Sequence, residues 1–335
     1  MTSSAKLPGE FELIARYFAP LAKGFAGAYA LLDDAAVITT QPGQQLVAKT
    51  DAIVAGVHFP ADEAADLVAR KALRVNLSDL AAKGAVPRCY MIDLVLPGTT
   101  TEDWVAAFAS GLEQDQRTFG MHLIGGDTNM TPGPLTIAVM ALGDIPNGKI
   151  LRRGGARAGD MIFVTGVIGD ASLGMAALHG ALSELDTTTA GLLIDRYRLP
   201  VPRVELGPRL IGLASASIDV SDGLVADLGH ICEVSGLGAV VEASRVPLSS
   251  AARATIAGDI SRLDMALTGG DDYEILFTAA PAATDKIGDL SRASGVPITT
   301  IGHMCDVPRA TQERVVVLDA AGEPMKLARR GWVHF

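Results

Sequence analysis

Short apolar runs and amphipathic stretches alternate from one end of the chain to the other. Runs typical of strands lie at residues 35–39, 45–49, 88–96, 121–124, 135–142, 161–165, 238–242, 275–278, 297–302 and 314–318. Apolar residues at helical spacing predict helices at residues 9–19, 62–83, 101–119, 192–199, 203–214, 222–235 and 282–294. The interleaved order predicts an α/β or α+β fold built in layers. A turn sequence at residues 41–43 predicts that the first two runs pair as a hairpin.

The helix predicted over residues 62–83 carries polar groups that bear on function. It stops before Gly84, a residue suited to the left-handed turn that ends many helices. Asn76, Asp79 and Lys83 stand at i, i+3 and i+7, so they share one face. That face suits solvated ion pairs and ligand binding equally well.

A polar, glycine-rich segment at residues 151–160 interrupts the pattern and predicts an inter-domain linker. The arginines of this segment include Arg153. They are equally consistent with bidentate hydrogen bonding to phosphate and with ordinary exposed positions. A chain of 335 residues is long enough for two domains, each with its own core. We expect an N-terminal domain over residues 1–150 and a C-terminal domain over residues 151–335.

Composition excludes several classes of function. The 38 acidic and 28 basic residues give a formal net charge of -10, and without a long basic run a nucleic-acid partner is not expected. A membrane location is also not expected, because no apolar run reaches the length of a membrane span and the chain starts without a signal-peptide pattern. Three widely spaced cysteines fit a reduced, cytoplasmic protein and predict neither disulfides nor a zinc site.

Aspartates recur where apolar runs give way to small or hydroxyl residues. Each one alone is better explained as a turn former or a helix cap. Together, at the ends of elements along one edge of a sheet, they would form a carboxylate cluster that needs cations to stay ionised. Magnesium prefers oxygen ligands and commonly bridges carboxylates and phosphates, so several Mg²⁺ ions with a phosphate substrate are predicted. The aspartates concerned are Asp34, Asp51, Asp79, Asp127, Asp219 and Asp222.

The stretch from Ala48 to Phe59 concentrates these features. Thr50 and Asp51 offer hard oxygen ligands directly after an apolar run, and Gly56 permits close backbone approach before His58. Elsewhere, the glycines of residues 125–128 permit approach to an anion, or merely a tight turn.

Residues 143–149 match the spacing of a P-loop. However, Ile150 stands where Ser or Thr would bind magnesium, and no helical pattern follows. The sequence therefore predicts no P-loop at this segment.

With these motifs in view, the chain resembles the thiamine-monophosphate kinase family of the aminoimidazole ribonucleotide synthetase-like superfamily. The resemblance spans nearly the whole chain. The motifs that carry it are Gly9-Glu10-Phe11, Asp33-Asp34-Ala35, Thr50-Asp51, Gly56-Val57-His58-Phe59, Asn76-Leu77-Ser78-Asp79-Leu80-Ala81-Ala82, Gly125-Gly126-Asp127-Thr128, Arg153, Asp219-Val220-Ser221-Asp222-Gly223-Leu224, Gly269-Gly270-Asp271-Asp272-Tyr273-Glu274 and Gly331-Trp332-Val333-His334-Phe335.

The resemblance implies transfer of the γ-phosphoryl group of ATP to thiamine phosphate, giving thiamine diphosphate. It also implies a homodimer of two-domain subunits with mixed sheets flanked by helices, in which the N-terminal domain binds ATP and Mg²⁺ and dimerises. The implied Mg²⁺ ligands are Asp34, Thr50, Asp51, Asp79, Asp127 and Asp219, with Asp222 at a further ion. Gly126, Asp127, Arg153 and Ser221 are implied on ATP, and His58, Asp271 and Trp332 near the thiamine moiety. Two positions depart from the family pattern: Lys49 replaces a frequent Ser or Thr, and Asp271 a usual Glu.

Elementary chemistry agrees with this implied reaction. A phosphate monoester has its second pKa near about 6, so as a nucleophile it is largely deprotonated at neutral pH and needs no general base. The obstacle is repulsion between the acceptor and the γ-phosphate, which metal ions and arginine can offset in an in-line transfer. No residue is therefore expected as general base or covalent nucleophile.

Two other functions remain open at this point. The same scaffold could activate another acceptor, as in relatives that make aminoimidazole ribonucleotide or selenophosphate. No cysteine precedes Cys89, which counts against an N-terminal redox-type catalytic residue. Alternatively, the aspartates could hold magnesium and nucleotide in a sensor without catalysis.

Overall fold

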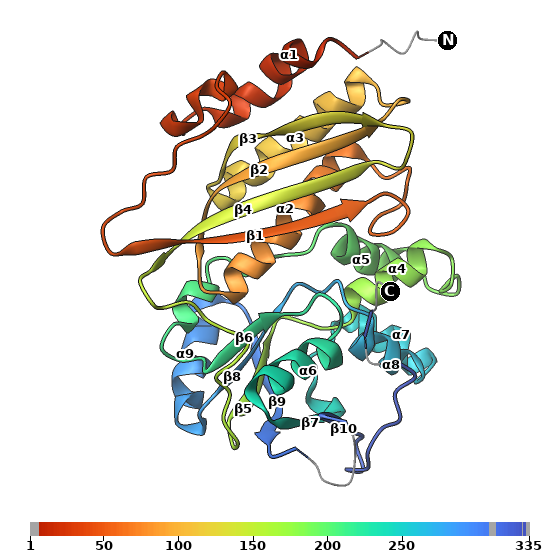
Figure 1. The fold of residues 1–335 in the computed structure, drawn as a ribbon. Coiled ribbons are helices and arrows are strands. Elements are labelled where there is room, and N and C mark those ends of the chain that lie inside the picture. The colour runs from red at the N-terminus through yellow and green to blue at the C-terminus, as the bar shows by residue number, and fades with distance from the viewer. Residues whose placement is uncertain (1–6, 308–312, 330, 333–335) are drawn as a thin grey trace. The chain divides into compact units, whose positions relative to one another are not determined.

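The computed structural model describes residues 7–307, 313–329 and 331–332. The chain divides into two compact units (Figure 1). Unit 1 comprises Met1–Leu80 and Ala85–Gly148, and unit 2 comprises Ala81–Gly84 and Lys149–Phe335. No helix among the described residues is long and apolar enough to cross a membrane.

Unit 1 is built on a four-stranded mixed sheet in the order β1-β4-β2-β3. Its strands are β1 (Gln44–Val54), β2 (Val86–Pro97), β3 (His122–Thr131) and β4 (Thr136–Pro146). β4 pairs antiparallel with β1 and β2, whereas β2 and β3 are parallel. The long helices α2 (Ala65–Ala82) and α3 (Glu102–Phe119) lie on one face of this sheet (Figure 1). Tyr90 and alternate residues after it on β2 are buried, as expected for a strand with one face on the core.

The N-terminal segment of unit 1 is helical but irregular. α1 (Glu10–Leu13) continues as a π-helical turn at Ile14–Phe18, and 3₁₀ turns follow at Ala19–Ala22 and Ala26–Leu31. The sequence predicted one helix over residues 9–19, and the structure confirms helical backbone there.

Unit 2 contains a six-stranded sheet in the order β10-β7-β9-β5-β8-β6. All neighbouring pairs are antiparallel except the parallel pair β7 and β10. The strands are β5 (Met161–Thr165), β6 (Ala216–Asp219), β7 (Gly238–Glu242), β8 (Ile275–Ala279), β9 (Ile298–Cys305) and β10 (Val315–Leu318). The helices are α4 (Asp170–Leu178), α5 (Thr187–Arg198), α6 (Leu224–Ser235), α7 (Ser250–Gly258), α8 (Arg262–Thr268) and α9 (Thr284–Ser294).

The core of unit 2 forms where α6 packs on the sheet. Leu228 and Ile231 of α6 are fully buried with Ile218 of β6 and Val241 of β7. Short 3₁₀ turns lie at Gly207–Leu210, Ala243–Arg245 and Pro281–Ala283.

Two sequence-based predictions of local structure were wrong. Residues 35–39 form no strand, and β1 pairs with β4 along its whole length instead of forming a hairpin. Residues 203–214 contain only the 3₁₀ turn Gly207–Leu210. In both cases, tertiary pairing and packing prevailed over a weak local pattern.

Candidate functional site

The first group of candidate ligands lies where β1 faces α2. Lys49 and Asp51, two residues apart on β1, point to the same face of the strand, and Asp79 reaches them from α2. The Lys49 Nζ atom lies 3.0 Å from Asp51 Oδ2 and 2.9 Å from Asp79 Oδ2. Thr50 lies between Lys49 and Asp51 in the strand, so its side chain points to the opposite face. We call Lys49, Asp51 and Asp79 the β1 group.

The charges within the β1 group stabilise one another. Burial lowers the pKa of the Lys49 ammonium, but hydrogen bonds and attraction to Asp79 and Asp51 outweigh that effect and raise the pKa above its ordinary value. Lys49 therefore carries a full positive charge at neutral pH. One helical turn before Asp79, Asn76 is fully buried, and its Oδ1 atom accepts no hydrogen bond from the described residues.

A second group lies along β3. Asp34, Gly126 and Asp127 line a cavity of about 320 Å³. Gly126 has a φ of 150°, and a Cβ atom there would lie 1.9 Å from the main-chain oxygen of Ile92, so glycine is required. The Asp127 side chain accepts the N–H of Thr128 at 2.9 Å. We call Asp34, Gly126 and Asp127 the β3 group.

The β1 and β3 groups lie on opposite edges of the sheet in unit 1. Asp51 pairs with Val139 on β4, Val139 with Ile92 on β2, and Ile92 with Gly126 on β3. Three steps of about 4.8 Å place the main chains of Asp51 and Gly126 roughly 14 Å apart. Asp51 and Asp127 also lie within their strands, so the prediction that they stand at strand ends on one sheet edge was wrong.

His58 lies in the tight turn that follows β1. Gly56 takes a φ of 79° there, and its N–H donates to the main-chain oxygen of Phe59 at 2.7 Å. The Nδ1 atom of His58 accepts the N–H of Val54 at 3.0 Å. In the neutral ring Nε2 consequently carries the proton, which makes it a hydrogen-bond donor.

In unit 2, three segments far apart in the sequence meet before α6. The N–H of Asp271 donates to the main-chain oxygen of Ser221 at 2.8 Å, and the N–H of Trp332 donates to that of Asp222 at 2.9 Å. Asp219, at the end of β6, is 3% exposed. Asp271 has a φ of 64°, in the left-handed region, which aspartate adopts more readily than most residues other than glycine. We call Asp219, Ser221, Asp222, Asp271 and Trp332 the α6 group.

Asp227 completes this arrangement, and the sequence analysis missed it. Its Oδ2 atom accepts the main-chain N–H groups of Ser221, Asp222 and Gly223 at 3.0, 3.0 and 3.2 Å. Burial and the charges of Asp219 and Asp222 raise the pKa of Asp227 well above its ordinary value. Its position in the first turn of α6 was the available signal. Ligand atoms of Asp222, Asp227 and His230 also lie within 4.8 Å of one another.

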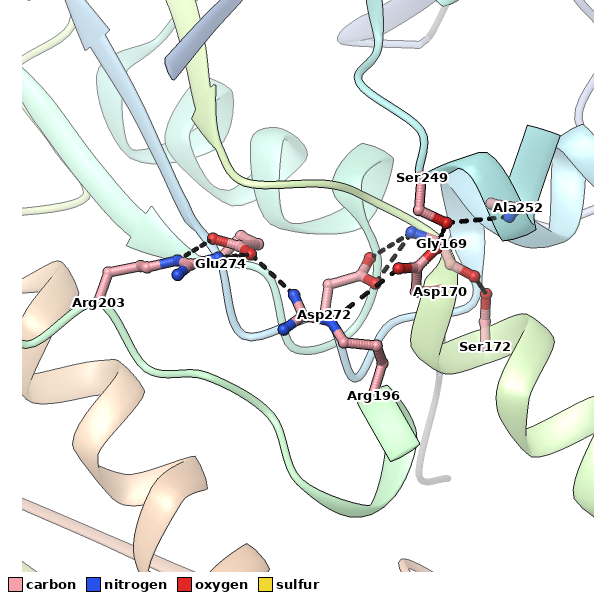
Figure 2. Close-up of polar contacts among 9 residues, drawn as sticks. All are labelled: Gly169, Asp170, Ser172, Arg196, Arg203, Ser249, Ala252, Asp272 and Glu274. Atoms are coloured by element: carbon pink, nitrogen blue, oxygen red, sulfur yellow. Dashed lines mark hydrogen bonds and ion pairs between the residues drawn. The ribbon is translucent and has the colours of Figure 1, made fainter. Parts of the chain in front are cut away.

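A buried ion network supports the loop that carries Asp271 (Figure 2). Glu274 is fully buried, and Arg203 donates to both of its carboxylate oxygens. Arg196 donates to Glu274 Oε1 at 3.1 Å, and the Thr165 hydroxyl donates to Oε2 at 2.7 Å. The sequence analysis missed this network too, because its members come from four separate segments.

Two further buried acids extend the network (Figure 2). Asp272 accepts the N–H of Gly169 at 2.9 and 3.0 Å with its two oxygens, and Asp170 accepts the Ser249 hydroxyl at 2.6 Å. Burial raises the pKa of both carboxyl groups, that of Asp272 well above its ordinary value. These contacts tie the start of α4 to the Asp271 loop.

Comparison with known proteins identifies the family of this chain. The AIR synthase related protein families match residues 32–145 for the N-terminal domain and 157–313 for the C-terminal domain. A thiamine-monophosphate kinase of Caulobacter vibrioides is 40% identical over 334 residues, covering 99% of this chain and 92% of that protein. This chain belongs to the thiamine-monophosphate kinase family.

Solved structures of the family have the same fold. The thiamine-monophosphate kinase of Stenotrophomonas maltophilia K279a superposes with a TM-score of 0.79 at 40% identity, over 88% of this chain and 91% of that one. AaThiL complexed with AMPPCP and TMP superposes with a TM-score of 0.76 at 29% identity, over 98% of this chain and 97% of that one.

Among the family motifs, Arg153 lies apart from the α6 group. The main-chain oxygen of the preceding residue, Arg152, accepts the N–H of Ser217 at 2.8 Å, near the start of β6. A Cβ atom on Gly154 would lie 2.8 Å from Val234, near the C-terminal end of α6. Ser221 lies at the other end of that helix.

The donor atoms of the β1 and β3 groups suit magnesium. The oxygen ligands are the carboxylates of Asp34, Asp51, Asp79 and Asp127, although the Lys49 ammonium group contacts two of them. The Asn76 Oδ1 atom, without a hydrogen bond from the described residues, is a further buried oxygen ligand one turn from Asp79. Hard oxygen donors of this kind select Mg²⁺ over softer metals. The residues therefore fit the ion that a kinase of this family would use with ATP.

Proposed function

We propose that this chain transfers the γ-phosphoryl group of ATP directly to thiamine phosphate, giving thiamine diphosphate and ADP. The observation that carries the proposal is the fold shared, over 98% of the chain, with AaThiL complexed with AMPPCP and TMP. The 40% identity with the kinase of Caulobacter vibrioides supports the same reaction.

We assign ATP and its Mg²⁺ ions to residues of the β3 group and of other segments. The β3 group presents a close-approach glycine and a carboxylate beside a cavity, which suits a nucleotide phosphate carried with Mg²⁺. Ser221 and Arg153 are assigned to ATP as well, Ser221 as a hydroxyl donor and Arg153 as a forked donor to phosphate. We assign Mg²⁺ in unit 1 to Asp34, Thr50, Asp51, Asp79 and Asp127, and in unit 2 to Asp219 and Asp222. Magnesium bound there would offset the negative charge of the phosphates.

We assign thiamine phosphate to His58, Asp271 and Trp332. His58 offers an Nε2–H donor, which suits a phosphate or pyrimidine acceptor. Trp332 is 40% exposed, so its ring is accessible to a thiazolium cation. The Asp271 carboxylate, which accepts the Tyr273 hydroxyl at 3.0 Å, belongs to the same α6 group. The acceptor phosphate is already ionised at neutral pH, so these side chains position it and no general base is assigned.

We also propose that the chain acts as a homodimer in the cytoplasm. The sheet face of unit 1 opposite α2 and α3 carries apolar side chains, among them Met140 at 43% exposure beside Met91 on the neighbouring strand. A second copy of this chain would cover that face. The thiols of Cys89 and Cys232 are free and buried, which fits a reducing compartment. Sedimentation equilibrium of the purified chain tests the dimer.

A coupled assay of ADP release tests the reaction against its two alternatives. We expect ADP release to depend on thiamine phosphate and thiamine diphosphate to accumulate in equal amount. Release that depends on another acceptor would indicate a different phosphotransferase on the same scaffold. ATP binding without turnover in the presence of thiamine phosphate and Mg²⁺ would indicate a sensor and overturn the proposal.

A further inference from the structure

The Lys49 ammonium group lies between the carboxylates of Asp51 on β1 and Asp79 on α2. Its Nζ atom lies 2.9 Å from Asp79 Oδ2 and 3.0 Å from Asp51 Oδ2. The Lys49 side chain is 28% exposed and the Asp79 side chain 15%, so this pair is largely removed from solvent screening.

The backbone explains why Lys49 reaches both acids. Strand geometry places the side chains of Lys49 and Asp51 on one face of β1, and Asp79 lies opposite them on α2. The ammonium group is a compact charge with three donors, which suits two carboxylate oxygens that come from different directions. Since Lys49 belongs to β1, its charge is covalently held near both acids.

We propose that the Lys49 ammonium is a built-in cation that replaces one bound divalent ion between Asp51 and Asp79. It neutralises one of the two negative charges there, and it would repel a divalent ion placed a few ångströms away. The inference deepens the proposed function and rests on it, because the divalent ions concerned are those that accompany ATP. A chain with an uncharged residue at position 49 is expected to bind one more divalent ion.

Counting bound Mn²⁺ tests this directly. Mn²⁺ would be titrated into the full chain with AMPPCP, and free Mn²⁺ followed by electron paramagnetic resonance. We expect Lys49→Thr and Lys49→Met to bind one more ion per chain than the wild type, or to bind the weakest ion at least about tenfold more tightly. Lys49→Arg keeps the charge and is expected to match the wild type. Equal counts and equal affinities in all four proteins would overturn the proposal.

Thermal melting provides a second readout that does not depend on turnover. Without divalent ions, Lys49→Met leaves Asp51 and Asp79 to repel each other, so its Tm is expected to fall, and added Mg²⁺ to restore it more than in the wild type. Lys23→Met makes the same substitution at an exposed position in unit 1 and serves as the matched control. An equal response to Mg²⁺ in Lys49→Met and the control would contradict the proposal. Activity of the wild type is measured separately, so failure of the proposed reaction is distinguishable from failure of this inference.

Discussion

The main-chain N–H of Trp332 donates a hydrogen bond of 2.9 Å to the main-chain oxygen of Asp222. The contact joins the last described residue of the chain to the loop before α6, where a predicted metal ligand lies. A Cβ atom on Gly331 would lie 2.4 Å from the Cβ of Ala226, so the absence of a side chain at Gly331 permits this approach. The end of the chain therefore belongs to the α6 group.

Trp332→Ala is expected to raise the KM for thiamine phosphate by roughly 2- to 30-fold, with smaller changes in kcat and in the KM for ATP. The reason is that an indole face attracts a cation by about 0.5 to 2 kcal/mol, equally in the ground and transition states. Steady-state kinetics measure kcat and both KM values. Trp332→Phe keeps an aromatic face, so its KM for thiamine phosphate should lie between those of the wild type and Trp332→Ala. An unchanged KM together with a lowered Tm would mean that Trp332 only anchors the chain end.

Asp51→Asn and Asp127→Asn are each expected to lower kcat by more than about a hundredfold while the protein stays folded. Removing one charged contact to a developing transition-state charge typically costs about 10²- to 10³-fold. Asp103→Asn, an exposed acid in the first turn of α3, controls for loss of charge alone. Near-normal turnover of either folded variant at saturating Mg²⁺ would show that its carboxylate does not serve the reaction.

Glu274→Gln is expected to lower the free energy of unfolding by about 3–5 kcal/mol, because Arg196 and Arg203 would lose a buried counter-charge. Urea unfolding measures the change. Glu242→Gln removes a carboxylate from the exposed pair with Arg245 and is expected to cost no more than about 1 kcal/mol. Similar small losses in both variants would show that the buried network adds little to stability.

The stability of the wild type should fall, relative to Asp272→Asn, as pH rises above about 4. The pKa of Asp272 is raised by burial in the folded protein, so the unfolded chain releases this proton first and ionisation favours unfolding. The difference should develop above the ordinary pKa of an aspartate, near 3.8, and level off above the folded-state pKa. Urea unfolding at a series of pH values measures the difference in free energy of unfolding between the two proteins. If this difference did not change with pH, the pKa of Asp272 would not be raised in the folded protein.

No phosphoenzyme is expected when radiolabelled ATP is supplied without thiamine phosphate. In-line transfer to an already ionised phosphate requires no enzyme nucleophile. Acid-quenched samples resolved by electrophoresis provide the measurement. A stoichiometric phospho-aspartate or phospho-histidine that passes its phosphate to thiamine phosphate would establish a covalent route instead.

Local patterns in the sequence were sufficient to predict the long elements. The apolar stripe and the following glycine predicted a helix at 62–83, and α2 spans Ala65–Ala82. The apolar run at 238–242 matches β7. These features depend on residues close together in the chain, where periodicity and end signals act directly on the backbone. The recurrence of aspartates likewise pointed to the motifs of the family.

Tertiary structure decided which of those motifs meet. β1 and β3 are the two edge strands of the sheet because β4 and β2 lie between them. This strand order separates Asp51 from Asp127. Trp332 reached Asp222, and Lys49 came between Asp51 and Asp79, through pairing and packing between distant segments. Sequence spacing carries no information on such contacts, because strand order and register are set by which buried surfaces fit together over the whole unit.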